Sequence, residues 1–208
     1  AFSLNGMAQS PLRKAEAAAK MKKSNANNLT MRAKLMYPTQ QAMNEDVVWR
    51  RDVYRELNLN DNANGGLYYP VEPTDGRMNL FTLLFKLMMA GPNHGGINVY
   101  QYRLDGNEKF TDDAKVKPLT FLDDHHIFYE RTDRGVHIPS AEVKAYYLKE
   151  SSYFDQATGT FHTKVLALCP VMERQDDFGE GTTKYPLFWV KYGDIASALA
   201  KQTVMTSN

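Results

Sequence analysis

The clearest pattern of hydrophobic and polar positions lies in the last third of the chain, where aromatic and β-branched residues alternate with polar ones. Two such segments, residues 143–154 and 161–172, flank a short polar turn at residues 155–160. A period of two is typical of β-strands, and a short turn between two of them favours an antiparallel hairpin. Residues 187–192 have the same character, with Pro186 in a position that suits an edge or a first strand residue. The pattern predicts strands of one sheet.

Residues 76–90 form a long apolar run with helical spacing. The apolar side chains lie nearly all round the predicted helix, which indicates that it is buried on most sides. They are Met78, Leu80, Phe81, Leu83, Leu84, Phe85, Leu87 and Met88. We expect Asp75 to cap this helix, and Gly91-Pro92 to end it.

The spacing of apolar and charged residues over 45–57 predicts another helix. It begins with two acids, which suit the positive end of a helix dipole. The residues at helical spacing are Val47, Val48, Arg51, Tyr54 and Arg55. This spacing places Arg51 and Arg55 on one face together with Val48, and Trp49 to the side.

Weaker patterns complete the expected fold. They predict a strand at residues 97–102, one or two helical turns at 110–117, a mixed stretch at 118–128 that ends in a strand, a polar loop at 173–184 and a last helix from Asp194 to about residue 204. The sequence therefore predicts an α+β fold, an antiparallel or mixed sheet with packed helices. Residues 44–208 would form this single domain, with the helix at 76–90 against the sheet.

Residues 1–43 differ in composition, being rich in Ala, Lys, Asn and Gln with almost no aromatics. Ordering the backbone costs roughly 1–2 kcal/mol per residue, which so little apolar surface cannot offset. We expect an extended basic N-terminal arm that orders only against a partner or a neighbouring copy. Its anchors would be Leu29, Met31, Leu35, Met36 and Tyr37. Residues 1–8 read either as the remnant of an export signal or as an ordinary terminus.

The amino-acid composition of the chain limits the kinds of partner that we expect. The chain of 208 residues is 43% hydrophobic and carries a net charge of +1, which favours no polyanion. The basic arm lacks the interleaved aromatics that stack on bases, so we expect no nucleic-acid partner. No segment approaches the roughly 18 uninterrupted apolar residues of a membrane span. Cys169 lies in an apolar run and is expected to be a buried, inert thiol.

Candidate catalytic chemistry is confined to Asp123-Asp124-His125-His126. In a strand, adjacent residues of this run point to opposite faces, so a zinc site would need ligands from elsewhere in the chain. No nucleophile elbow or phosphate-binding loop surrounds the serines and glycines. We expect no catalytic residue, metal or cofactor. A periplasmic metal-dependent hydrolase that uses the Asp123–His126 cluster is the alternative function.

A cluster of aromatic and arginine residues indicates a protein interface instead, because these residue types dominate interface energies when they are desolvated. The cluster consists of Trp49, Arg50, Arg51, Arg55, Tyr68 and Tyr69. Arg50 or Arg51 would pair with a partner carboxylate in a fork. The other interpretation places Trp49 and one tyrosine in the core and leaves the arginines solvated.

Six short segments carry a family resemblance: residues 48–51, 67–70, 143–150, 153–155, 164–170 and 186–190. In this order and spacing, they make residues 44–206 resemble the GldN/PorN family. The resemblance implies a periplasmic part of the type IX secretion and gliding machinery of Bacteroidetes. It also implies a ring with a GldK/PorK-type outer-membrane lipoprotein, which would hold the protein at the inner face of the outer membrane. A GldM/PorM-type periplasmic shaft would be a second partner, and no catalytic residue is implied.

Overall fold

The computed structural model describes residues 47–202 except 125–126, 128–129, 133–134 and 176–180. Its strands are β1 (Val47–Asn58), β2 (Tyr100–Gln101), β3 (Glu130–Thr132), β4 (Gly135–His137), β5 (Val143–Asp155), β6 (Thr160–Gln175), β7 (Thr182–Pro186) and β8 (Phe188–Lys191). Its α-helices are α3 (Gly65–Tyr68), α4 (Leu80–Ala90), α5 (Pro118–Asp124) and α6 (Tyr192–Leu199). Four 3-10 turns lie at Asn62–Asn64, Pro92–His94, Asp112–Ala114 and Ser140–Glu142.

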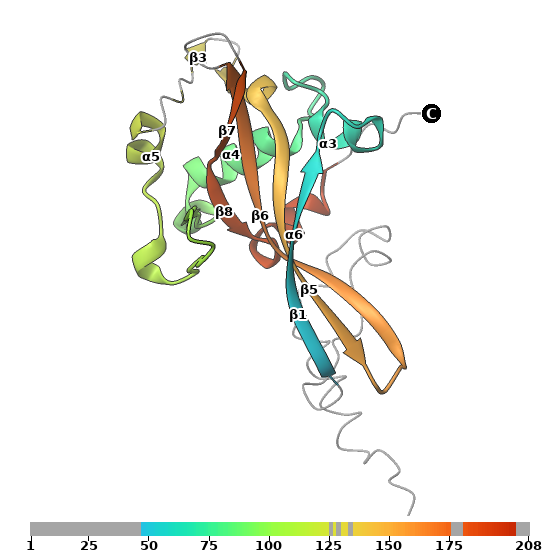
Figure 1. Ribbon diagram of the computed structural model, residues 1–208. Coiled ribbons are helices and arrows are strands. Elements are labelled where there is room, and N and C mark those ends of the chain that lie inside the picture. The colour runs from blue at the N-terminus through green and yellow to red at the C-terminus, as the bar shows by residue number, and fades with distance from the viewer. Residues whose placement is uncertain (1–46, 125–126, 128–129, 133–134, 176–180, 203–208) are drawn as a thin grey trace, which may run out of the picture.

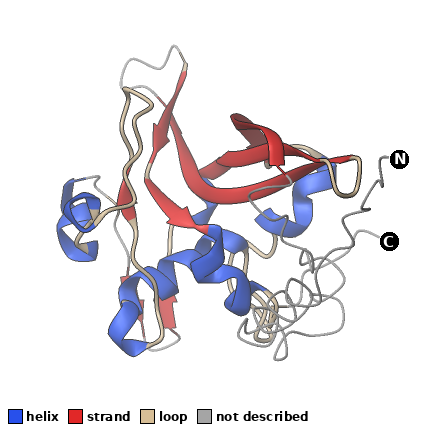
Figure 2. Cartoon of the chain, turned by 90° about the horizontal axis from the view of Figure 1, so that it is seen from below, coloured by secondary structure: helices blue, strands red, loops and turns tan. Residues whose placement is uncertain are grey.

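The strands form a six-stranded antiparallel sheet in the order β1-β5-β6-β8-β2, with β7 paired to β6, and the separate hairpin β3-β4. The helices flank this sheet (Figures 1 and 2). The predicted α+β class is confirmed. The predicted hairpin at residues 143–154 and 161–172 is confirmed as β5 and β6, which pair from Val143↔Met172 to Asp155↔Thr160.

Apolar residues are buried on both faces of the central strands. In β5, Tyr146 packs in the main core, whereas its neighbour Tyr147 packs against a second cluster around Trp189 and Cys169. Adjacent residues of a strand point to opposite faces, so the two tyrosines mark two separate cores. The main core contains Phe81, Leu84, Phe85 and Met88 of α4, together with Leu168, Phe188 and Ile195.

Helix α4 confirms the predicted buried helix, but it begins later than expected. Its cap is Asn79, whose side chain accepts a hydrogen bond from the backbone N–H of Thr82 at 2.8 Å. Asp75, the predicted cap, instead lies in a turn with a φ of 52°. Gly91 ends the helix with a φ of 68°, a conformation that favours glycine, as the Gly91-Pro92 prediction required.

The helix predicted at residues 45–57 is wrong. Those residues that the structure describes form β1, which pairs with β5 from Val47↔Asp155 to Asn58↔Ala145. The segment is rich in β-branched and aromatic residues, which suit a strand, and its apolar spacing fits both periods. Long-range pairing with β5 decides between them, because it satisfies the backbone groups of both strands.

Smaller elements also differ from the prediction. The strand predicted at residues 97–102 is shortened to β2, and the helical turns predicted at 110–117 are a single 3-10 turn. Residues 118–124 of the predicted mixed stretch form the helix α5, and the last helix is Tyr192–Leu199. The predicted loop at 173–184 is shorter than expected, because β6 extends to Gln175 and β7 begins at Thr182. Pro186 does not begin the strand predicted at residues 187–192, which is β8, but ends the strand β7; among the described strands β7 pairs only with β6, so Pro186 does lie in an edge strand. The arm at residues 1–43 lies outside the described residues.

Strands β1, β5 and β6 run on together past the helices as a three-stranded ribbon (Figure 1). We call its far end the ribbon tip, defined as residues 47–51, 152–155 and 160–163. The pairs Trp49↔Phe154 and Phe154↔Phe161 hold the three strands in register there.

Candidate interaction surface

Strand alternation sorts the predicted interface residues of β1 into two faces. Trp49, Arg51 and Arg55 share one face, as their spacing of two residues requires, and Arg50 lies on the other. Arg51 and Arg55 are therefore on one face, as predicted, but with Trp49 rather than Val48. The physical reason is the period of two in a strand, where the helix prediction assumed 3.6.

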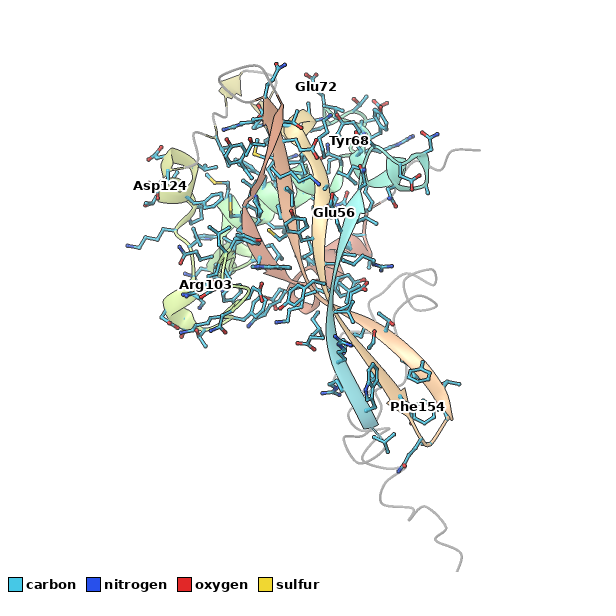
Figure 3. All side chains as sticks on the ribbon, in the orientation of Figure 1. Glu56, Tyr68, Glu72, Arg103, Asp124 and Phe154 are labelled. Carbon is cyan, nitrogen blue, oxygen red and sulfur yellow. The ribbon has the colours of Figure 1, made fainter. Side chains whose placement is uncertain are left out.

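One face of the ribbon tip carries a cluster of aromatic rings from all three strands. The ring of Trp49 meets Phe161 edge-on at 6.0 Å between centroids, and Phe154 lies 4.9 Å from Phe161. Figure 3 places Phe154 far out on the projecting ribbon. Trp49 is 45% exposed and Phe161 is 73% exposed, so the cluster stays open to solvent. Exposed aromatic clusters of this kind mark binding surfaces.

The opposite face of the ribbon tip combines rings with positive charge. The guanidinium of Arg50 lies 5.9 Å from the centroid of the Tyr153 ring, within the range of a cation–π contact. Tyr153 in turn stacks on His162 with 5.4 Å between centroids. Sequence reasoning named Arg50 but missed Phe154, Phe161 and His162, because only the pairing of β5 and β6 brings them beside β1.

Arg55 forms an ion pair with a buried carboxylate of β5, although its own side chain is 60% exposed. Its Nη2 donates to Oε1 of Glu150 at 2.5 Å, and the carboxylate side chain is only 6% exposed. A carboxylate buried to this degree requires a charged or hydrogen-bonding partner. The guanidinium of Arg55 therefore has a structural task in the sheet, whereas Arg50 and Arg51 lie exposed nearer the ribbon tip.

Tyr68 and Tyr69 lie at the other end of the molecule from the ribbon tip, as Figure 3 shows for Tyr68. Their rings meet edge-on at 4.9 Å, and Lys144 Nζ donates to the Tyr68 hydroxyl at 2.7 Å. Tyr69 is 56% exposed. Nine strand residues separate Trp49 from the end of β1, a length of about 30 Å against about 14 Å in a helix. The predicted single patch is thus two surfaces.

A polar network joins β1, β5 and the loop after β2 between these two surfaces. The hydroxyl of Tyr54 donates to Oε2 of Glu108 at 2.6 Å, and Lys149 Nζ lies 3.6 Å from the same oxygen. Burial, followed by the hydrogen bond to Glu108, raises the pKa of Tyr54. Burial lowers the pKa of Lys149, but Tyr54, Glu108 and Asp52 outweigh it and raise the pKa overall. Both groups stay protonated at neutral pH, and their contacts hold the ribbon to the body.

The Asp123–His126 cluster does not form a strand. Asp123 and Asp124 are exposed at the end of α5, and His125 and His126 lie outside the described residues. Among the residues that are described, no group of three His, Cys, Asp or Glu side chains could hold a metal ion. The hydrolase alternative is not favoured. Cys169 is buried as predicted, and its pKa is raised, chiefly by burial.

The described helices are all too short or too polar to cross a membrane. No curated protein matches the chain. The GldN family, described as gliding motility associated protein GldN, matches residues 42–208. This match covers every described element and leaves residues 1–41, most of the arm, outside it. The expected resemblance is confirmed, and the chain belongs to the GldN family of gliding-motility-associated proteins.

Proposed function

We propose that this protein is a non-enzymatic structural component of the type IX secretion and gliding machinery. It builds a periplasmic ring with a GldK/PorK-type outer-membrane lipoprotein and contacts a GldM/PorM-type shaft. The observation that carries the proposal is the family match over the whole of residues 42–208. The lipoprotein partner would hold the protein at the inner face of the outer membrane.

The ribbon tip is the surface we assign to the lipoprotein. It projects from the body and exposes Trp49 and Phe161 beside Arg50 and Arg51. Aromatic rings supply contact area at little entropic cost, and an arginine fork binds a carboxylate in two parallel hydrogen bonds. Tyr68 and Tyr69, which were predicted for the same interface, remain proposals for a second surface at the other end of the molecule, and Arg55, which lies between the two on β1, remains a proposed interface residue. The shaft or a neighbouring copy is the partner we assign to that surface.

The general proposal is tested by capturing the tagged full-length protein from cells of its own organism. We expect the lipoprotein and the shaft protein to be recovered with it. Recovery of soluble enzymes or nucleic acid in their place would contradict the proposal. Fractionation of the same cells tests the periplasmic location, because the protein should follow the lipoprotein into the outer-membrane fraction.

The ribbon tip is tested by replacing Trp49 and Phe161 together by alanine. The matched control is Leu104→Ala, because Leu104 is 95% exposed and lies away from the ribbon. We expect the double variant to lose capture of the lipoprotein while keeping its melting temperature, and the control to lose neither. If the guanidinium of Arg51 pairs with a partner carboxylate, Arg51→Glu should also lose capture of the lipoprotein while keeping its melting temperature. Normal capture by the double variant would remove the ribbon tip from the interface.

The arm is tested by deleting residues 9–36, which contain the proposed anchors Leu29, Met31, Leu35 and Met36. The anchors Met36 and Tyr37 are changed to alanine in a separate variant. We expect both variants to fold, since the arm lies outside the family match, but to assemble poorly. Full complex formation by the deleted protein would show that the arm has no part in assembly.

A further inference from the structure

β1 has a free edge. Among the described residues it pairs only with β5, so the backbone N–H and C=O groups on its other side have no partner strand. Proteins usually blunt such edges with short strands, prolines or bulges. β1 has 12 residues and no proline, and its one irregularity lies at its start, between Val47 and Trp49. A long, regular edge of this kind is a template for strand addition.

The arm contains a segment with the pattern of an added strand. From residue 29 to residue 37, every odd position is apolar: Leu29, Met31, Ala33, Leu35 and Tyr37. Thr30, Arg32 and Lys34 lie between the first four, Met36 is the one apolar residue at an even position, and Pro38 follows Tyr37 directly. Alternation over residues 29–35 predicts a strand with one apolar face, and a proline ends it. This segment lies before the family match, so it belongs to this chain's own arm.

The two faces of this segment match the two faces of β1. One face of β1 carries Trp49, Val53 and Leu57 with Arg51 and Arg55 between them, and the other carries Asp52 and Glu56 with Arg50 and Tyr54. If the odd-numbered arm residues lie on the side of Trp49, they extend that apolar face, and Arg32 and Lys34 come to the side of the two acids. Cross-strand pairs of these kinds each contribute roughly 0.2–1 kcal/mol. A shift by one residue would instead place Leu29, Met31 and Leu35 beside the acids and move Arg32 and Lys34 away from them.

The connection to β1 favours a neighbouring copy over the same chain. Residues 38–46 separate the segment from β1, whereas most hairpins use two to five residues. Extended, nine residues reach about 30 Å, which is enough to cross to an adjacent subunit. We propose that residues 29–37 of one copy add as a strand to the free edge of β1 in the next copy. This proposal rests on the proposed function, because it requires that copies of the protein lie side by side in an assembly.

Mixed cysteine cross-linking of the full-length assembled protein tests this directly. One copy carries Ala33→Cys, and a second copy with a different tag carries Arg51→Cys or Val53→Cys. Cys169 stays in place, because it is buried. Opposite residues of paired strands come within disulfide range, so we expect an oxidised dimer that contains both tags. The matched control, Ser10→Cys in the arm, should give no such dimer.

A single chain that carries both cysteines tests the alternative, in which the arm pairs with β1 of its own chain. An internal cross-link in that chain, without mixed dimers, would show that the arm folds back on its own β1 and would overturn the proposal. Absence of any cross-link at both pairings, Ala33 with Arg51 and Ala33 with Val53, would overturn it as well. Leu35→Pro should abolish the mixed dimer, because proline removes a ladder hydrogen bond, whereas Gln41→Pro in the connection should preserve it.

The outcome is separable from the proposed function. If mixed dimers are absent while the protein still captures the lipoprotein, the strand exchange is wrong and the function stands. If mixed dimers form but no component of the secretion machinery is recovered, the exchange is supported and the function is wrong.

Discussion

Single residues decide which charges of β1 are available to a partner. Arg55 and Arg51 have the same chemistry, face and strand, yet only Arg55 meets the buried carboxylate of Glu150. That pair lies 95 residues apart in the chain. No local pattern distinguishes the two arginines, because Glu150 of β5 is in register with Val53, between them, and only the tertiary structure shows that it pairs with Arg55.

Arg55→Ala should lower the free energy of unfolding by about 1–3 kcal/mol, because it leaves Glu150 buried without its charged partner. The double variant Arg55→Ala/Glu150→Gln should recover part of this loss, as a double-mutant cycle would show. Arg51→Ala is the matched control and should change stability by less than about 0.5 kcal/mol. Equal effects of the two arginine variants in urea unfolding would contradict the assignment.

Asp105 reports on the exposed loop after β2. The hydrogen bond from Arg103, followed by that from the backbone of Asn107, lowers the pKa of Asp105 from 3.8 to about 2. Because the pKa of Asp105 is lower in the folded state than in the unfolded state, this carboxylate stabilises the folded protein above pH 3.8. Its contribution to stability is lost as the pH falls through about 2. Titration of the Asp105 carboxyl by NMR should give the low pKa. Arg103→Gln should return it towards its ordinary value, and an unchanged titration would exclude the pairing.

A helix or strand can be predicted from the sequence when the residues that determine it lie within its own segment. The prediction fails when they lie elsewhere in the chain. Helix α4 holds its own apolar residues, its cap and its terminating glycine within one continuous segment, and it was predicted. β1 contains none of its own ladder partners, since the backbone groups that pair with it lie on β5. Its helical prediction failed for that reason.

Asn79→Ala should cost about 1 kcal/mol or more, because it removes the cap of α4 and the hydrogen bond from Asn79 Nδ2 to the Tyr68 carbonyl. Asp75→Gly is the control, since glycine accepts the φ of 52° and no helix cap is lost. Thermal melting compares the two variants. Greater destabilisation by Asp75→Gly would restore the cap predicted from the sequence.

At the scale of the whole molecule, α4 joins the helices to the sheet through one main core. Leu84 is fully buried there, whereas Leu104 is 95% exposed. Leu84→Asp should cost several kcal/mol because it buries an unpaired charge, and Leu104→Asp should leave the melting temperature nearly unchanged. If the two variants melt alike, the core has been placed wrongly.

The sequence by itself determined the α+β class, the hairpin of β5 and β6, the buried helix α4 and the family, because alternation, helical spacing and motif order are local properties. It also named Trp49 and Arg50 as candidates. Only the tertiary structure decided that residues 47–58 form a strand, that Phe154 and Phe161 join Trp49, and that Tyr68 lies far away. These outcomes depend on hydrogen bonds and packing between segments about a hundred residues apart, which no local window contains.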